Sequence, residues 1–156
     1  MAWVRQFGSR RYDEAWAEAV GPEGIYLDGF TDGRLPGTHD RGGRDAFVGL
    51  YTRKGKRVWL RQFGSNRDDF GYGLAADTSG VYVSGQTAGA FRGFTNRGGL
   101  DAFVRKLSPA GSTILDPAVR DEARRWGLRG RRGERQGGRR RRDRGGVPRP
   151  CEPRRG

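Results

Sequence analysis

A block of 56 residues occurs twice in this chain, and no other feature of the sequence restricts its fold as strongly. Residues 3–58 align with residues 59–114 without a gap, and 23 of the 56 positions are identical. The matching phrases include "WVRQFG" with "WLRQFG", and "RGGRDAFV" with "RGGLDAFV". Repeats of roughly this length build solenoids, propellers or arrays, so we expect two copies of one structural unit that pack against each other.

Within each copy, apolar residues alternate with polar ones, and this period of two predicts β-strands. In the second copy, "FGYGLAAD" places Phe70, Tyr72 and Leu74 on one face of a strand, and "VYVSGQT" returns after the turn "TSG". Four short antiparallel strands in a unit predict an all-β fold of two β-propeller-type blades. The expected elements are hairpins over Ala15–Thr31 and Gly71–Thr87, and a strand pair of Ala46–Tyr51 with Arg57–Phe63.

The second blade is expected to be incomplete. Its fourth strand should begin near Ser112, but the repeat pattern is lost from Leu115 on, and Pro117 cannot donate a ladder hydrogen bond. A three-stranded second blade is the favoured prediction. The alternative is that Ala2–Phe7, which repeats the fourth-strand phrase, closes the second blade by pairing with Ala102–Leu107.

The phrases W-x-R-Q-F-G, Y-V-x-G-x-T and G-G-x-D-A-F-V-x-K resemble those of the bacterial seven-bladed β-propeller repeat family, known as SBBP. The resemblance covers about residues 3–114, in both copies. The first copy departs from it at "AEAVGPEG", which lacks the turn aspartate present in "LAADTSG". The resemblance implies a non-enzymatic scaffold or ligand-binding fragment of a bacterial surface or secreted protein. It implies no catalytic residue, no cofactor and no metal site, and further blades as partners.

The chain divides into the two repeats, residues 1–114, and a low-complexity tail, residues 115–156. Residues 1–115 carry a net charge of +4, whereas residues 116–156 carry +9. The tail is rich in Arg and Gly and nearly free of aromatic residues, so we expect it to be disordered, apart from a short helix near Pro117–Trp126.

Two interpretations of the tail stay open. In the favoured one, the third copy is encoded out of frame: "LDPAVR", Leu115–Arg120, permits codons that, read one base later, give W-T-R-Q-F-G at the expected position. The alternative is a nucleic-acid-binding protein that works through its Arg-rich tail, with salt-dependent affinity for phosphates.

No catalytic constellation is evident among the acidic residues. Asp69 has the counterpart Asp13 and is expected to cap its own turn, whereas Asp68 has Tyr12 as its counterpart. Asp45 and Asp101 open equivalent strands and are interpreted as structural pegs between blades. A calcium site is not expected, because no D-x-D-x-D-G loop is present.

The remaining candidates are aromatic residues and loops. The aromatics at repeated positions are expected to form the core between the sheets rather than a ligand site; they are Trp3, Trp59, Phe7, Phe63, Tyr26 and Tyr82. The loops Phe30–Gly43 and Gln86–Gly99 are the better candidates for binding. His39, whose counterpart is Thr95, is expected in a solvated loop, and the lone Cys151 cannot form an internal disulfide.

No stretch is apolar enough to span a membrane, and the first residues, "MAWVRQFG", do not read as a signal peptide. With two blades, a ring cannot close, so the expected partners are further blades or other copies that bind at open blade edges.

Overall fold

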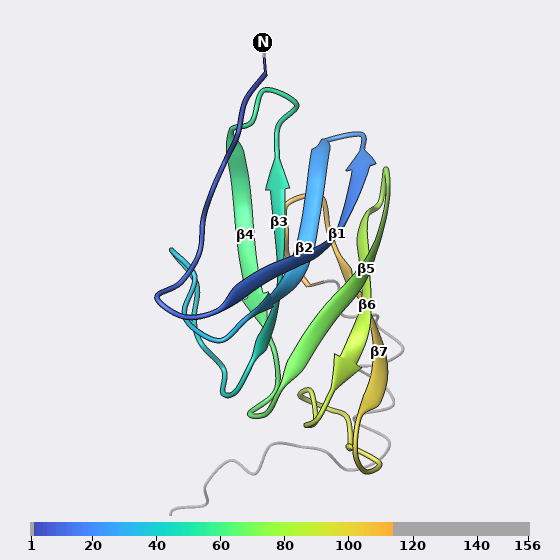
Figure 1. The fold of residues 1–156 in the computed structure, drawn as a ribbon. Coiled ribbons are helices and arrows are strands. Elements are labelled where there is room, and N and C mark those ends of the chain that lie inside the picture. Colours follow the sequence, from blue (N-terminus) through green and yellow to red (C-terminus); the bar gives the residue numbers. More distant parts are fainter. Residues whose placement is uncertain (1, 114–156) are drawn as a thin grey trace, which may run out of the picture.

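The computed structural model describes residues 2–113, which form seven β-strands and no helix (Figure 1). The strands make two antiparallel sheets, in the orders β1-β2-β3-β4 and β5-β6-β7. The prediction of an all-β fold of blade-like sheets is therefore confirmed. The strands are β1 (Asp13–Gly21), β2 (Gly24–Thr31), β3 (Asp45–Tyr51), β4 (Arg57–Phe63), β5 (Asp69–Asp77), β6 (Gly80–Thr87) and β7 (Asp101–Leu107).

Both predicted hairpins and the β3–β4 pair are present. β1 pairs with β2, and β5 pairs with β6, in registers that are the same after a shift of 56 residues. Each first strand begins two residues earlier than predicted, at Asp13 and Asp69, which pair with Thr31 and Thr87. The first copy forms its hairpin even though its turn, Pro22–Glu23, lacks the aspartate of the second.

The prediction that Phe70, Tyr72 and Leu74 lie on one face of a strand is wrong, because the first strand of each sheet contains a β-bulge. The register shifts between Gly71 and Gly73, so strict alternation does not continue through Tyr72. Phe70 and Tyr72 stack on each other with ring centroids 5.9 Å apart, whereas Leu74 packs against the core on the other side. A bulge adds one residue to a strand, and the inward set of side chains changes parity at that point.

Only glycine fits opposite each bulge, because there is no room for a side chain. A Cβ atom on Gly85 would collide with the carbonyl oxygen of Phe70, and one on Gly29 would collide with that of Glu14. This close approach of backbones accounts for the glycine that the two copies share in "YLDG" and "YVSG".

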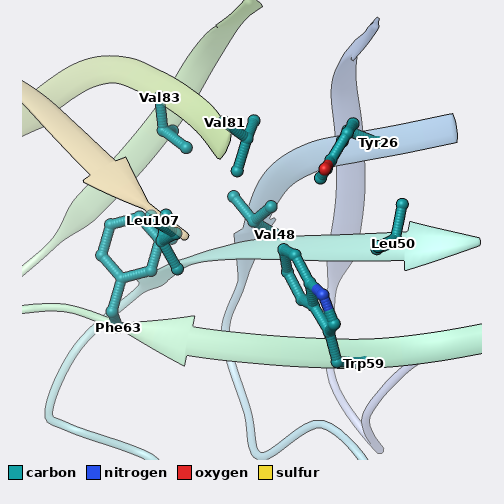
Figure 2. Packing of buried hydrophobic residues seen from close by; sticks show 9 residues of the cluster. Tyr26, Val48, Leu50, Trp59, Phe63, Val81, Val83 and Leu107 are labelled. Carbon is teal, nitrogen blue, oxygen red and sulfur yellow. The ribbon is translucent and has the colours of Figure 1, made fainter. Parts of the chain in front are cut away.

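The main hydrophobic core lies between the two sheets. Figure 2 shows Val81 and Val83 of β6 and Leu107 of β7 directed toward the side chains of the first sheet. Val48 in β3 is fully buried there, and Trp59 and Phe63 of β4 are less than a tenth exposed. This arrangement confirms the expected packing of repeated aromatics between sheets for Tyr26, Trp59 and Phe63. Their counterparts Tyr82, Trp3 and Phe7 are only half-buried or exposed.

Residues 2–8 lie on the opposite side of the first sheet, and they form no strand. There Phe7 packs against a second cluster of buried residues, made of Leu35, Phe47 and Leu60. No backbone pairing joins this segment to β7, so the alternative in which Ala2–Phe7 closes the second blade of its own chain is wrong. Within residues 2–113 the second sheet has three strands, as favoured, with one further bridge from Leu107 to Thr113. The predicted helix near Pro117–Trp126 and the rest of the tail lie outside the described residues.

The segment of residues 2–8 occupies on the first sheet the place that β4 occupies on the second. The indole nitrogen of Trp3 donates to the carbonyl oxygen of Arg53 at 3.1 Å, and that of Trp59 donates to Pro109 at 2.8 Å. The next arginine in each phrase, Arg5 or Arg61, donates to the carbonyl of a turn glycine 50 residues ahead, at 2.7 and 2.8 Å. The W-x-R phrase is therefore a device that joins successive units.

Candidate functional site

The antiparallel topology brings four connecting segments to one end of the molecule, at the left and bottom of Figure 1. We call this the loop end. It comprises residues 8–12, 32–44, 64–68 and 88–100, and so it includes both loops that the sequence suggested for binding. Loops held at one end of a rigid pair of sheets are the usual place for a binding surface.

Aspartates hold the shorter segments in place. Asp69 accepts hydrogen bonds from the backbone amide of Ser65 at 2.6 Å and from its hydroxyl at 2.9 Å. Asp13 accepts the same two bonds from Ser9, and a third from Thr31. Both carboxylates therefore close the four-residue turns that precede their strands, which agrees with the interpretation of Asp69 as a turn cap.

Gln62 fastens the longer loop of the first copy. Its amide oxygen accepts from the amide of Leu35 at 3.0 Å and from the hydroxyl of Thr38 at 2.6 Å. Its amide nitrogen donates to Gly33 at 2.9 Å and to Asp45 at 2.8 Å. This buried set of bonds ties Asp45 to its own loop, within one blade rather than between blades. The identity of Gln6 and Gln62 in the repeated phrase is the sequence signal that points to this clamp.

Asp68 connects the two copies. Its carboxylate accepts from the backbone amide of Arg44 at 3.0 Å, and the amide of Asp69 donates to the carbonyl of Arg44 at 2.8 Å. The guanidinium of Arg44 pairs with Asp32 at 2.8 Å, and this bond raises the arginine pKa. Neither paired-carboxylate chemistry nor cation binding is suggested by these contacts, because the Asp68 oxygen faces donors.

The loop of the second copy encloses a broad, shallow hollow. Its volume is about 630 Å³, and it lies between the turn at Asn66 and the loop after β6. The amide of Asn96 donates to the carbonyl of Gly89 at 3.2 Å, where Gln62 serves the equivalent Gly33 in the first copy. The hollow is lined by Asn66, Arg67, Ala88, Gly89, Ala90, Asn96, Gly99 and Leu100.

The loop end is strongly basic. It carries eight arginines and three aspartates, and all eight arginine residues are exposed. These arginines are Arg10, Arg11, Arg34, Arg41, Arg44, Arg67, Arg92 and Arg97. Clustered exposed charges of one sign attract ligands of the other sign and raise their local concentration.

The other candidate residues do not converge on a site. His39 is exposed in the first loop, and Asp101 accepts a hydrogen bond from the amide of Arg97 at 2.8 Å. Among residues 2–113, no group of three or more metal-ligating side chains comes together, and no helix is long and apolar enough to cross a membrane. Cys151 lies outside the described residues.

Sequence reasoning missed one buried ionisable group, Asp28 in β2. The side chain is fully buried between the sheets, and neither oxygen has a hydrogen bond of good geometry. Burial raises its pKa to about 7, although the nearby amide of Ala17 opposes the shift. Its counterpart is Ser84, so the repeat gave no signal for this position.

The comparison with protein families agrees with this architecture. Residues 58–92, which run from β4 through β5 and β6 into the following loop, match the family model described as SBBP, β-propeller repeat. This segment is similar to an SBBP β-propeller repeat. No curated protein matches the chain. The SBBP match supports a propeller-type fold and names no ligand.

Proposed function

We propose that this chain is a non-enzymatic binding scaffold, in which SBBP-type blades present the basic loop end to an anionic ligand. The observation that carries the proposal is the gathering of eight exposed arginines at the loop end, where the hollow also lies with Arg67 in its lining. The family resemblance supports a structural or binding role over catalysis. A bacterial surface or secreted location, implied by the same resemblance, belongs to the proposal.

Charge reversal at the rim of the hollow tests this function. The double variant Arg67→Glu/Arg97→Glu changes two exposed side chains at the loop end, one of them lining the hollow. We expect its affinity for a polyglutamate probe to fall at least about tenfold at low salt, since each reversal turns attraction into repulsion. Binding is measured by fluorescence anisotropy of the labelled probe.

The matched control is Arg53→Glu/Arg57→Glu, which makes the same charge change at the opposite end of the sheets. The Arg-rich tail is unchanged in both variants, so its contribution to binding is common to them. Equal losses of affinity in the two variants would show that net charge alone matters, and would refute a site at the loop end.

The alternative function, nucleic-acid binding by the tail, is tested on separate residues. Replacing Arg139–Arg142 by alanine would weaken RNA binding and reduce its salt dependence if the tail carries it, and would leave the loop-end effect intact. The coding DNA gives a second test: a third repeat phrase in the shifted frame, followed by more blades, would exclude a selected nucleic-acid-binding tail.

A further inference from the structure

The contact between the two sheets can be made again between two copies of the chain. Inside one chain, the side of the first sheet that bears Tyr26, Val48 and Leu50 is covered by the second sheet. The covering side bears Val81 and Val83, which are fully buried. Because the two units are repeats, each of these two surfaces has a counterpart elsewhere on the molecule.

The counterpart surface on the second sheet is uncovered in the described residues, and the one on the first sheet is covered only in part, by residues 2–8 and Leu35. We call the side of the second sheet that bears Tyr82 and Val104 the last face; Val104 is 76% exposed, whereas its counterpart Val48 is 0% exposed. We call the side of the first sheet that bears Val20, Ile25 and Leu27 the first face. Val20 is 62% exposed, and the other two are half-buried. Exposed apolar residues on two complementary faces mark an interaction surface.

The outer edge of β7, which borders the last face, also matches one particular strand. In the first sheet, β3 pairs with β4 in a register that sets Val48 opposite Arg61 and Ala46 opposite Phe63. β7 pairs with β6 on one side, and on its other side the described residues add only the bridge from Leu107 to Thr113. Residues 3–7, "WVRQF", repeat "WLRQF" of β4 at four of five positions, whereas residues 115–119, "LDPAV", repeat it at none.

The strand from a second copy needs no rearrangement to reach this edge. Residues 3–7 already lie on their own first sheet as β4 lies on the second, with the same Trp and Arg contacts to the next turn. No backbone hydrogen bond joins them to another segment among residues 2–113. The segment therefore has a free edge for pairing.

The loop after β6 lacks the side chain that this strand would bring. In the first repeat, Gln62 bonds to Gly33 and Leu35 in the loop and to Asp45. Their counterparts are Gly89, Phe91 and Asp101; of these, Gly89 accepts from Asn96. Gln6 in residues 3–7 is exposed. A second chain that supplied its Gln6 at this place would complete the loop clamp of the second repeat.

We propose that copies of this chain associate head to tail: the first face of one copy covers the last face of another, and its residues 3–7 add to β7 as a fourth strand. The register sets Arg5 opposite Val104 and Phe7 opposite Ala102. Unlike surfaces meet in such an interface, so it propagates into open chains or closed rings. Main-chain bonds of the added strand supply affinity, and the side-chain register supplies specificity.

Complementary blocking variants test the direction of assembly. Val104→Glu places a charge on the last face and Val20→Glu places one on the first face, and both residues are exposed in one copy. Each variant alone should be monomeric in sedimentation velocity, with self-association weakened at least about tenfold. An equimolar mixture should form a 1:1 dimer and nothing larger, because one intact first face meets one intact last face.

Thr78→Glu is the control for an added charge. Thr78 is exposed, and its counterpart Pro22 stays exposed although the second sheet covers that side of the first. This variant should assemble like the parent chain. A mixture of the two blocking variants that stays monomeric would overturn the proposal, as would association of the parent that neither variant weakens.

Cross-linking tests the register. In a Cys151→Ser background, Arg5→Cys with Val104→Cys should give disulfide-linked oligomers whose cross-linked peptide contains residues 5 and 104. Moving the first cysteine to Val4 places its thiol on the other side of the strand and should abolish the cross-link. If residues 115–119 of the same chain fill the edge, neither cysteine pair links two copies, and the proposal fails.

Discussion

At the scale of single residues, identical side chains in the two copies have diverged in role because of what covers them. Val48 and Val104 differ only in their neighbours, and Gln62 is buried in a network of hydrogen bonds while Gln6 is exposed. Positions at which the two copies carry different residues are as informative. Asp28 is a buried carboxyl group at a position where the second copy has Ser84.

Asp28 makes stability depend on pH. Its folded pKa of about 7 lies above the ordinary value of 3.8, so the folded state holds the proton more tightly than the unfolded state. This destabilises the folded protein as pH rises from about 4 to about 7, by up to about 4 kcal/mol, and the loss is constant at higher pH. Asp28→Asn should remove this loss and be more stable than the parent at pH 8. Urea unfolding of both proteins between pH 4 and 8 measures the difference, and equal slopes would contradict the assignment.

Gln62→Leu should cost about 2–4 kcal/mol of unfolding free energy. The substitution leaves the buried amide of Leu35 without its partner and removes one of the two hydrogen bonds to the buried carboxylate of Asp45, the other being from the amide of Arg41. Gln6→Leu is the matched control, and at low protein concentration it should cost less than about 0.5 kcal/mol because Gln6 is exposed. Denaturant unfolding of the two variants checks both values, and similar losses would show that the clamp contributes little.

At the scale of strands, the 56-residue repeat predicted the hairpins and their pairing, because the alternation of side chains and the turn residues recur in register. The bulge at Tyr72 was not predictable in this way. Alternation in "FGYGLAAD" is consistent with an unbroken strand, and only the glycine on the neighbouring strand hints at a displaced carbonyl. The loops could be chosen as candidate sites from their length, but the hollow depends on side-chain amides whose partners the sequence does not reveal.

Gly85→Ala tests the bulge. The added methyl group would meet the carbonyl oxygen of Phe70 and the ring of Phe103, so either the bulge or the β5–β6 pairing must shift. We expect a loss of at least about 2 kcal/mol, within the range known for overpacked sites. Ser84→Ala, at the exposed neighbouring position, should be nearly neutral. Thermal unfolding followed by circular dichroism measures both, and a neutral Gly85→Ala would show that the close approach relaxes easily.

At the scale of the whole molecule, the two sheets share one core, so residues 2–113 should unfold in a single transition. Val83 and Val104 lie on opposite sides of the second sheet, the first fully buried and the second 76% exposed. Val83→Ala should cost about 1–3 kcal/mol and Val104→Ala less than about 0.5 kcal/mol at low protein concentration. Chemical unfolding checks the pair. Two separate transitions in the parent chain would mean that the sheets fold independently.

The paired tryptophan contacts allow the coupling between neighbouring units to be measured at a single junction, which longer arrays do not allow. In a linear array, stability is the sum of an intrinsic term for each unit and a coupling term for each junction, and many junctions contribute at once. Here the same indole-to-carbonyl contact occurs once at a junction between two sheets, through Trp59, and once between a sheet and a short segment, through Trp3. The difference between the costs of Trp59→Ala and Trp3→Ala therefore isolates the share of nearest-neighbour coupling that depends on a complete adjoining sheet.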